Sequence, residues 1–422
     1  MLETQRLASV ALAAVLAGRS LTAVLQETLH AHPDLGAGER GALTDLCYGA
    51  LRHYGELDAV LALLRPAHVH PLLRSLLLVA LYQLVHTRAA AHAVVDHAVS
   101  CAAALKQPRA KALVNAVLRT FLRRRAELVA QAGASPVGRY SHPQWWIDKL
   151  RQQHPDDYRR VLEIDNQRPP MTLRVNRRAT SPADYLALLA AHGLEARALG
   201  GAAIMLDTAL PVERLPGFVE GKVSVQDAAA QHAAPLLDVA DGMRVLDACS
   251  APGGKATHLL ELADIELLAL DRDGARVQRL QQNLARLALR AEVKIADVLD
   301  TAQWWNGRAF DRVLCDAPCS ASGVVRRHPD IKWLRRRGDI EQFARVQAAM
   351  LDALWRTLAS GGKLLYATCS VFDEENRDQA ARFVERHPDA KRLTVAIGQA
   401  RHGQLLPDTE HDGFFYALFA KD

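Results

Sequence analysis

Short apolar segments alternate with longer amphipathic segments from Gln226 to the end of the chain. The short segments have the length and aliphatic content of buried strands, and the longer ones show the 3–4 residue spacing of helices. Strands that alternate with helices in this way predict a doubly wound α/β sheet with helices on both faces. The predicted strands are Val245–Ala248, Glu266–Leu270, Ala291–Ala296, Phe310–Cys315, Leu364–Ala367 and Phe414–Phe419, and the predicted helices are Lys255–Ala263, Gly274–Leu287, Ile340–Leu358 and Glu374–His387. We expect Gly361-Gly362 to terminate the third of these helices.

The first half of the chain follows a different pattern. Residues 1 to about 130 are predicted to be all helical, with the strongly apolar Pro71–Leu84 as a central buried helix. A loop rich in glycine and serine marks a boundary near residue 135, and a helical connector and a small α/β module follow. A length of 422 residues agrees with two or three domains. We therefore expect three parts, at 1–130, 131–225 and 226–422.

Composition limits the classes of protein to consider. Six cysteines in 422 residues do not form a disulfide framework. The apolar stretch Leu7–Leu16 follows Glu3 and Arg6 without net positive charge, so we interpret it as an amphipathic helix and not as a signal segment. The sequence contains no run of about 20 apolar residues, so it predicts no membrane span. We expect a cytoplasmic protein without a membrane partner, and its net charge of +5 is mildly basic.

Polar residues follow several predicted strands at the end where open α/β sheets bind ligands. The first turn reads Asp-Ala-Cys-Ser-Ala-Pro-Gly-Gly-Lys from Asp247 to Lys255, and its two glycines allow a ligand to approach the backbone closely. It is not a triphosphate-binding loop, because that motif requires glycine at Cys249 and serine or threonine at Ala256. Three later strands end in acids, at Asp271, Asp297 and Asp316. This series predicts an adenosine cofactor without a pyrophosphate, and S-adenosylmethionine fits that description.

Two cysteines also stand at predicted strand ends. Cys319 follows Asp316-Ala317-Pro318, and Cys369 lies in Thr368-Cys369-Ser370. A thiolate that adds to carbon 6 of cytosine makes carbon 5 nucleophilic enough to accept a methyl group, and a base must later remove the carbon 5 proton. A carboxyl group beside ring nitrogen 3 stabilises the charge that develops. Asp316, Cys319 and Cys369 together provide the groups that such a reaction needs.

These motifs carry a family resemblance. The turn 247–255, Asp316–Ser320 and Thr368–Ser370 resemble the motifs of RNA 5-methylcytosine methyltransferases, and Tyr48–Arg52, Ala93–Asp96 and Val114–Arg119 resemble the NusB-type RNA-binding helical domain. The whole chain is thus similar to the RsmB (Sun/Fmu) family, which implies a Rossmann-like, S-adenosylmethionine-dependent catalytic domain and small-subunit ribosomal RNA as substrate. We expect a monomer without a metal. In that family the Thr-Cys-Ser cysteine attacks the base and the Pro-Cys cysteine assists release, which correspond here to Cys369 and Cys319, with Asp316 as the third catalytic residue. The implied cofactor-binding residues are Cys249, Ser250, Ala251, Pro252, Gly253, Gly254, Lys255, Asp271, Asp297 and Asp316.

Several alternatives stay open at this point. The same chemistry could act on transfer RNA, and a non-catalytic RNA-binding assembly factor could retain the fold. Zinc binding by Cys249, Cys315, Cys319 and Cys369 is disfavoured, because the spacing is unusual and Cys315 should point into the sheet. Other basic or aromatic residues either contact RNA or have only a structural or solvated role: Arg174, Arg177, Arg178, Arg326-Arg327-His328, Trp333 and Arg335-Arg336-Arg337.

Overall fold

The structure is a computed structural model that describes residues 2–64, 69–398 and 400–422. The chain divides into two compact units, one containing residues up to 168 together with 325–337, the other containing 169–324 and 338–422. Within the described residues, no helix is long and apolar enough to cross a membrane.

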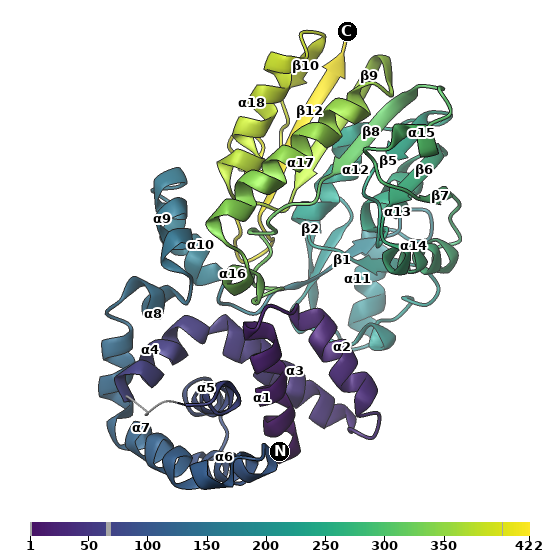
Figure 1. The fold of residues 1–422 in the computed structure, drawn as a ribbon. Coiled ribbons are helices and arrows are strands. Elements are labelled where there is room, and N and C mark those ends of the chain that lie inside the picture. The colour runs from purple at the N-terminus through teal and green to yellow at the C-terminus, as the bar shows by residue number, and fades with distance from the viewer. Residues whose placement is uncertain (1, 65–68, 399) are drawn as a thin grey trace. The chain divides into compact units, whose positions relative to one another are not determined.

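The first unit is helical, as predicted. The helix α5 (Pro71–His86) is buried on nearly every side from Leu73 to Leu84, because it is apolar all round and its neighbours cover each face. Figure 1 shows it seen end-on inside a ring of helices. Those neighbours are α1 (Leu2–Leu16), α3 (Ala37–Arg52), α4 (Tyr54–Leu64), α6 (Ala91–Ala104) and α7 (Lys111–Ala132). The unit also contains α2 (Leu21–Ala31), α8 (Pro136–Tyr140), α9 (Gln144–Gln153) and α10 (Tyr158–Ile164), the last two of which replace the single predicted connector.

The segment 325–337 belongs to this helical unit although the sequence places it between two catalytic-domain elements. Its short helix α16 (Ile331–Leu334) carries Trp333, whose indole Nε1 donates to the Leu51 carbonyl at 2.8 Å. The Trp333 ring also meets Tyr54 edge-on, with centroids 4.7 Å apart. Lys332 is fully buried, and its Nζ donates to the Arg52 carbonyl at 2.9 Å. Of the two roles considered for Trp333, the structure therefore supports anchoring of the segment.

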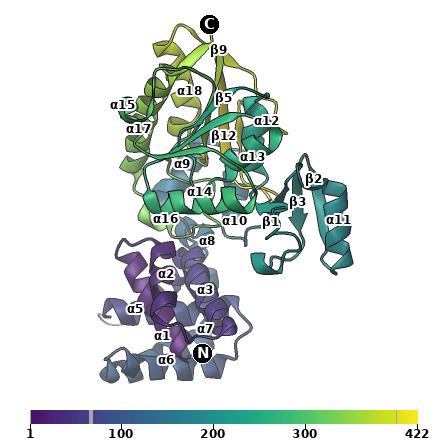
Figure 2. The same ribbon diagram turned by 90° about the vertical axis from the view of Figure 1, so that its right-hand side faces the viewer.

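The second unit contains two sheets. The smaller is antiparallel, with the order β2-β3-β1-β4, and Figure 2 shows α11 (Pro182–Ala191) lying beside it. Its strands are β1 (Met171–Val175), β2 (Ala196–Gly200), β3 (Ala203–Leu206) and β4 (Val223–Val225). The helix α11 packs against β2 and β3, which agrees with the predicted small α/β module.

The larger sheet has the order β10-β12-β9-β8-β5-β6-β7, with β11 paired to β12. The strands β5 to β9 are parallel, and β12 runs antiparallel to β9. The chain moves outward from β5 through β6 to β7 and then returns to place β8 on the other side of β5. This reversal creates the switch point at which doubly wound sheets bind ligands. The strands are β5 (Arg244–Asp247), β6 (Glu266–Asp271), β7 (Glu292–Ile295), β8 (Phe310–Asp316), β9 (Leu358–Thr368), β10 (Ala390–Leu393), β11 (Gln404–Leu405) and β12 (Phe414–Lys421).

Both faces of the larger sheet are covered, which confirms the predicted doubly wound arrangement (Figure 1). Alternate residues of one strand face opposite cores, so that Leu246 packs with α17 and α18 whereas Val245 packs with α12 and α13. The covering helices are α12 (Ala233–Leu237), α13 (Gly254–Leu262), α14 (Gly274–Arg286), α15 (Thr301–Trp304), α17 (Arg337–Trp355) and α18 (Arg377–Arg386).

One predicted boundary in this sheet is wrong. Gly361-Gly362 do not terminate a helix, because α17 ends at Trp355 and both glycines lie within β9. The pairing of β8 with β9 shifts register between Phe310 and Arg312, and Gly361 has φ +73° in the extra residues of this bulge. Glycine accepts that conformation without strain, which explains Gly361.

Candidate active site

A cavity of about 290 Å³ opens at the carboxyl ends of β5, β6 and β8. It brings together six of the residues that the sequence analysis singled out, which are Cys249, Asp271, Asp297, Asp316, Cys319 and Cys369. The rest of the predicted cofactor loop, from Ser250 to Lys255, does not line this cavity. That part of the loop affects the site indirectly, through the shape of the turn and through the contacts of Lys255.

The two thiols lie side by side. The Sγ atoms of Cys319 and Cys369 are 3.4 Å apart, and both side chains are partly exposed. The hydrogen bond with Cys369, burial and the nearby Glu375 carboxylate together raise the pKa of Cys319 well above its ordinary value. These contacts favour the protonated thiol of Cys319.

Lys255 and Asp316 form an ion pair beside the thiols. The Nζ of Lys255 donates to Asp316 Oδ2 at 2.5 Å, and the ammonium lies 5.3 Å from the centre of the Phe414 ring. Burial alone would lower the pKa of Lys255, but the Asp316 carboxylate outweighs it and the pKa is raised. The pair holds the Asp316 carboxylate, which lines the cavity, beside a positive charge.

The turn after β5 has the backbone geometry of a close-approach loop. Gly253 has φ +102°, and a Cβ at this position would lie 2.6 Å from Leu280 Cδ1, so only glycine fits. The turn is closed by the Gly253 N–H, which donates to the Ser250 carbonyl at 2.7 Å. The buried Asp271 accepts from the Ala251 N–H at 3.2 Å and thereby ties the turn to the end of β6.

Asp297 occupies the opposite rim of the cavity. Its carboxylate accepts from the Leu299 N–H at 2.9 Å and stabilises the bend that follows β7. Leu299 lines the cavity and is 47% exposed, and Ile295 nearby is 63% exposed. This rim thus offers a carboxylate next to apolar surface.

The sequence analysis missed one buried acid, Glu375, which lies behind both thiols. Its carboxylate accepts from the N–H and hydroxyl of Ser320, at 2.8 and 2.5 Å, and from the Ser370 hydroxyl at 2.6 Å. Gln347 Nε2 donates to the same carboxylate at 3.1 Å. Burial raises the pKa of Glu375, and these hydrogen bonds partly offset the rise. Since Ser320 and Ser370 directly follow the two cysteines, one carboxylate holds both thiol-bearing loops.

The sequence contains only a weak signal for this role. Glu375 ends the acidic run Asp373-Glu374-Glu375, which is typical of the solvated first turn of a helix. A buried acid that accepts from serines on two distant loops cannot be distinguished from a solvated one by local pattern. The only other indication in the sequence is that a serine, Ser320 or Ser370, directly follows each of the two cysteines.

The four cysteines considered for zinc do not form a metal site in the described part of the chain. The only such group there consists of His53, Glu56 and His86 in the helical unit. The His53 and His86 rings are stacked, with centroids 3.7 Å apart and planes within 17° of each other. An imidazole nitrogen binds a metal through a lone pair that lies in the plane of its ring. Because the two rings are nearly parallel, these lone pairs do not converge on one ion.

Comparison with known proteins assigns each part of the chain to a described family. Residues 234–420 match the family model "16S rRNA methyltransferase RsmB/F", and residues 142–213 match "Methyltr_RsmF/B-like, ferredoxin-like domain". Residues 2–123 match the NusB family.

Curated relatives match over almost the full length. The chain is 44% identical to "Ribosomal RNA small subunit methyltransferase B" of Serratia proteamaculans over 98% of both chains. It is 46% identical to the protein of the same name from Pseudomonas putida, over 98% of this chain and 97% of the relative. Among solved structures, a methyltransferase homolog protein from Pyrococcus horikoshii is 26% identical, with a TM-score of 0.61 over 68% of this chain and 100% of the other.

Proposed function

The chain belongs to the 16S rRNA methyltransferase RsmB/F family, and from that premise we propose that it methylates carbon 5 of a cytosine in small-subunit ribosomal RNA, with S-adenosylmethionine as donor. The observation that carries the proposal is the pair of sulfur atoms 3.4 Å apart in a cavity that also contains Asp316. Two thiols within reach of one base can divide attack and release between them.

We assign the attack to Cys369. Its thiolate adds to carbon 6 of the cytosine, and the electrons of the carbon 5–carbon 6 double bond make carbon 5 nucleophilic. After methylation, loss of the carbon 5 proton restores the double bond as the sulfur–carbon 6 bond breaks. Cys319 is the residue we assign to this release, because its sulfur lies 3.4 Å from that of Cys369 and so within reach of the same base.

Asp316 and Lys255 act on the ring of the base. Asp316 is the carboxyl group that we place beside ring nitrogen 3, where it stabilises charge that develops as the thiolate adds. Lys255 holds that carboxylate in a single orientation through their 2.5 Å contact. Glu375 holds both cysteine loops and so fixes the distance between the two sulfur atoms.

The residues around the turn fit S-adenosylmethionine. Gly253, whose φ of +102° favours glycine, shapes the turn that we assign to the amino-acid end of the donor. Asp271 suits the ribose hydroxyls, and Asp297 with the apolar Val298 and Leu299 suits the adenine. When bound, the donor supplies an electrophilic methyl group. The cavity volume is near the lower end of the range for ligand sites.

We also propose the division into parts at 1–130, 131–225 and 226–422, with RNA contacts on the first two, in a monomeric cytoplasmic enzyme without a metal. The family matches to separate NusB, ferredoxin-like and methyltransferase segments support this division.

The test is transfer of labelled methyl groups to purified small-subunit ribosomal RNA and to bulk transfer RNA, followed by nucleoside analysis. Label in 5-methylcytosine of the ribosomal RNA alone is the expected result. Label in transfer RNA alone would retain the chemistry and overturn the substrate. Absence of label in both, and in small-subunit particles, would favour a non-catalytic assembly factor.

A further inference from the structure

We propose that Arg174 is a positioning residue for the methyl donor, because its guanidinium holds the first turn of α13 and thereby the glycine turn that precedes it. The inference rests on the proposed function of that turn. Arg174 lies on β1 of the small sheet, about 80 residues before the helix that it contacts.

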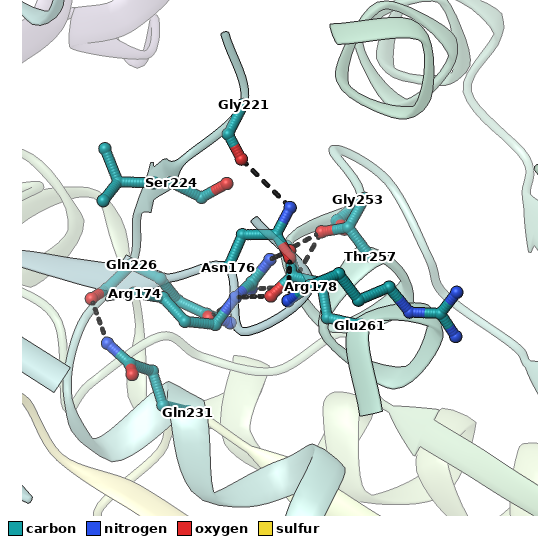
Figure 3. A network of polar contacts seen from close by, with 12 residues as sticks. Arg174, Asn176, Arg178, Gly221, Ser224, Gln226, Gln231, Gly253, Thr257 and Glu261 are labelled. Atoms are coloured by element: carbon teal, nitrogen blue, oxygen red, sulfur yellow. Dashed lines mark hydrogen bonds and ion pairs between the residues drawn. The ribbon is translucent and has the colours of Figure 1, made fainter. Parts of the chain in front are cut away.

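Arg174 is fully buried and does not point to solvent. It therefore does not contact RNA or decorate an exposed strand end, which were the two roles considered from the sequence. The neighbouring Arg177 and Arg178 are exposed and keep both possibilities. Figure 3 shows the Arg174 side chain directed toward Thr257 and Glu261 of α13.

Each nitrogen of the guanidinium donates to a named acceptor. Nε and Nη2 form a fork with the Glu261 carboxylate at 3.0 and 2.7 Å, and Nη2 also donates to Thr257 Oγ1 at 2.9 Å. Nη1 donates to Gln226 Oε1 at 2.6 Å and to the Gly254 carbonyl. All five N–H groups are used, which a lysine ammonium with three donors at one point cannot reproduce.

The contacts with Gly254 and Thr257 connect Arg174 to the donor turn. Gly254 is the first residue of α13 and directly follows Gly253 with its φ of +102°. Thr257 in turn donates from its hydroxyl to the Gly253 carbonyl at 2.8 Å. Arg174 thus binds the Gly254 carbonyl directly and the Gly253 carbonyl through Thr257. On the other side of the turn, Asp271 binds the N–H of Ala251.

A second arginine provides a matched control. Arg286 of α14 connects the same two modules, through hydrogen bonds to the carbonyls of Phe218 and Val223 at 2.6 and 3.0 Å. Its guanidinium also stacks over the Phe218 ring, 4.1 Å from the centroid. Arg286 therefore docks the small sheet on the catalytic domain as Arg174 does, but at the end of α14 and without a contact to the donor turn.

The experiment compares Arg174→Lys with Arg286→Lys in the full-length protein. Binding of S-adenosylmethionine is measured by calorimetry in the absence of RNA, next to RNA affinity and thermal unfolding. We expect Arg174→Lys to weaken donor binding about tenfold and Arg286→Lys to change it less than about twofold, because only the first disturbs the turn. RNA affinity should stay within about twofold for both, since neither residue is placed against RNA in this proposal.

A second variant separates positioning from stability. In Arg174→Met with Glu261→Met, apolar side chains of similar length replace the buried ion pair, so folding is retained better than after loss of one partner. Donor binding should still fall, because the Gly254 carbonyl loses its guanidinium. Equal donor affinity in wild type, Arg174→Lys and this double variant would overturn this inference but leave the proposed function intact. Equal weakening by Arg286→Lys would also overturn it, in favour of general docking. Absence of donor binding by the wild type would instead overturn the proposed function and this inference with it.

Discussion

Two parts of the proposed site are each held by one buried ionic side chain, and these two side chains differ in sign and in origin. We call the loops that carry Cys319 and Cys369 the thiol end, and the glycine turn that we assign to the methyl donor the donor end. At the thiol end, the Glu375 carboxylate accepts hydrogen bonds from Ser320, Ser370 and Gln347. At the donor end, the Arg174 guanidinium donates to Gln226, Gly254, Thr257 and Glu261. Each side chain organises loops that are distant in sequence.

The difference in origin has consequences for function. Glu375 follows β9, and its carboxylate binds loops at the ends of β8 and β9 and the helix α17, so the thiol end is built by the larger sheet and its helix. Arg174 comes from the small sheet, so the donor end depends on a second module. Disturbance at Glu375 should therefore reduce the rate of chemistry, whereas disturbance at Arg174 should reduce affinity for the donor.

The largest effect is expected for Cys369→Ala, which removes the proposed nucleophile from the thiol end. Methyl transfer should fall by at least about a thousandfold, because carbon 5 of cytosine is a poor nucleophile without thiolate addition. Single-turnover transfer of labelled methyl groups measures this loss. Donor binding by calorimetry should match the wild type and serves as the control. Full activity of the variant would remove Cys369 as nucleophile.

Cys319→Ala should block release and leave addition intact. Turnover should fall about a hundredfold, and a covalent RNA–protein adduct should accumulate as a slowly migrating band on a denaturing gel. The double variant Cys319→Ala with Cys369→Ala is the matched control and should give no such band. Preserved turnover without an adduct would exclude Cys319 from release.

Glu375→Gln should lower kcat about tenfold to a hundredfold and leave the KM for S-adenosylmethionine within about twofold. The amide has one oxygen where the carboxylate has two, and its NH₂ group faces hydroxyl donors, so the spacing of the two thiols is no longer fixed. Steady-state kinetics with varied donor concentration measures the two constants separately. Glu385→Gln on the exposed side of α18 is the control. A raised KM with unchanged kcat would contradict the assignment of Glu375 to the thiol end.

The residues that meet in the cavity were predictable because a simple rule connects sequence to space. Parallel strands bring their carboxyl ends to one edge, so Asp316, Cys319 and Cys369 could be expected together without knowledge of the strand order. Their roles in catalysis stay predictions. Arg174 and Glu375 could not be found in this way, since both act through contacts between segments whose distance depends on the complete fold. Arg174 is buried, and it contacts α13, a helix about 80 residues further along the chain.

The smallest expected effect concerns Asp247, a buried acid that is near both the donor turn and Asp316. Asp247 is fully buried at the end of β5, directly before the donor turn. Burial, and next the Asp316 carboxylate of the thiol end, raise the pKa of Asp247 to about 7. A carboxyl group whose pKa is raised in the folded state stabilises that state below its unfolded pKa and loses this contribution as pH rises through the folded pKa.

The free energy of unfolding of the wild type should therefore decrease between pH of about 4 and 7 by up to a few kcal/mol relative to Asp247→Asn, which does not titrate. Thermal unfolding midpoints of both proteins, measured across this range, provide the comparison. The exposed Asp300→Asn is the control, and its profile should run parallel to the wild type. A difference between wild type and Asp247→Asn that stays constant with pH would show that Asp247 is ionised throughout. Neither burial nor the Asp316 carboxylate would then raise the pKa of Asp247 in the folded protein.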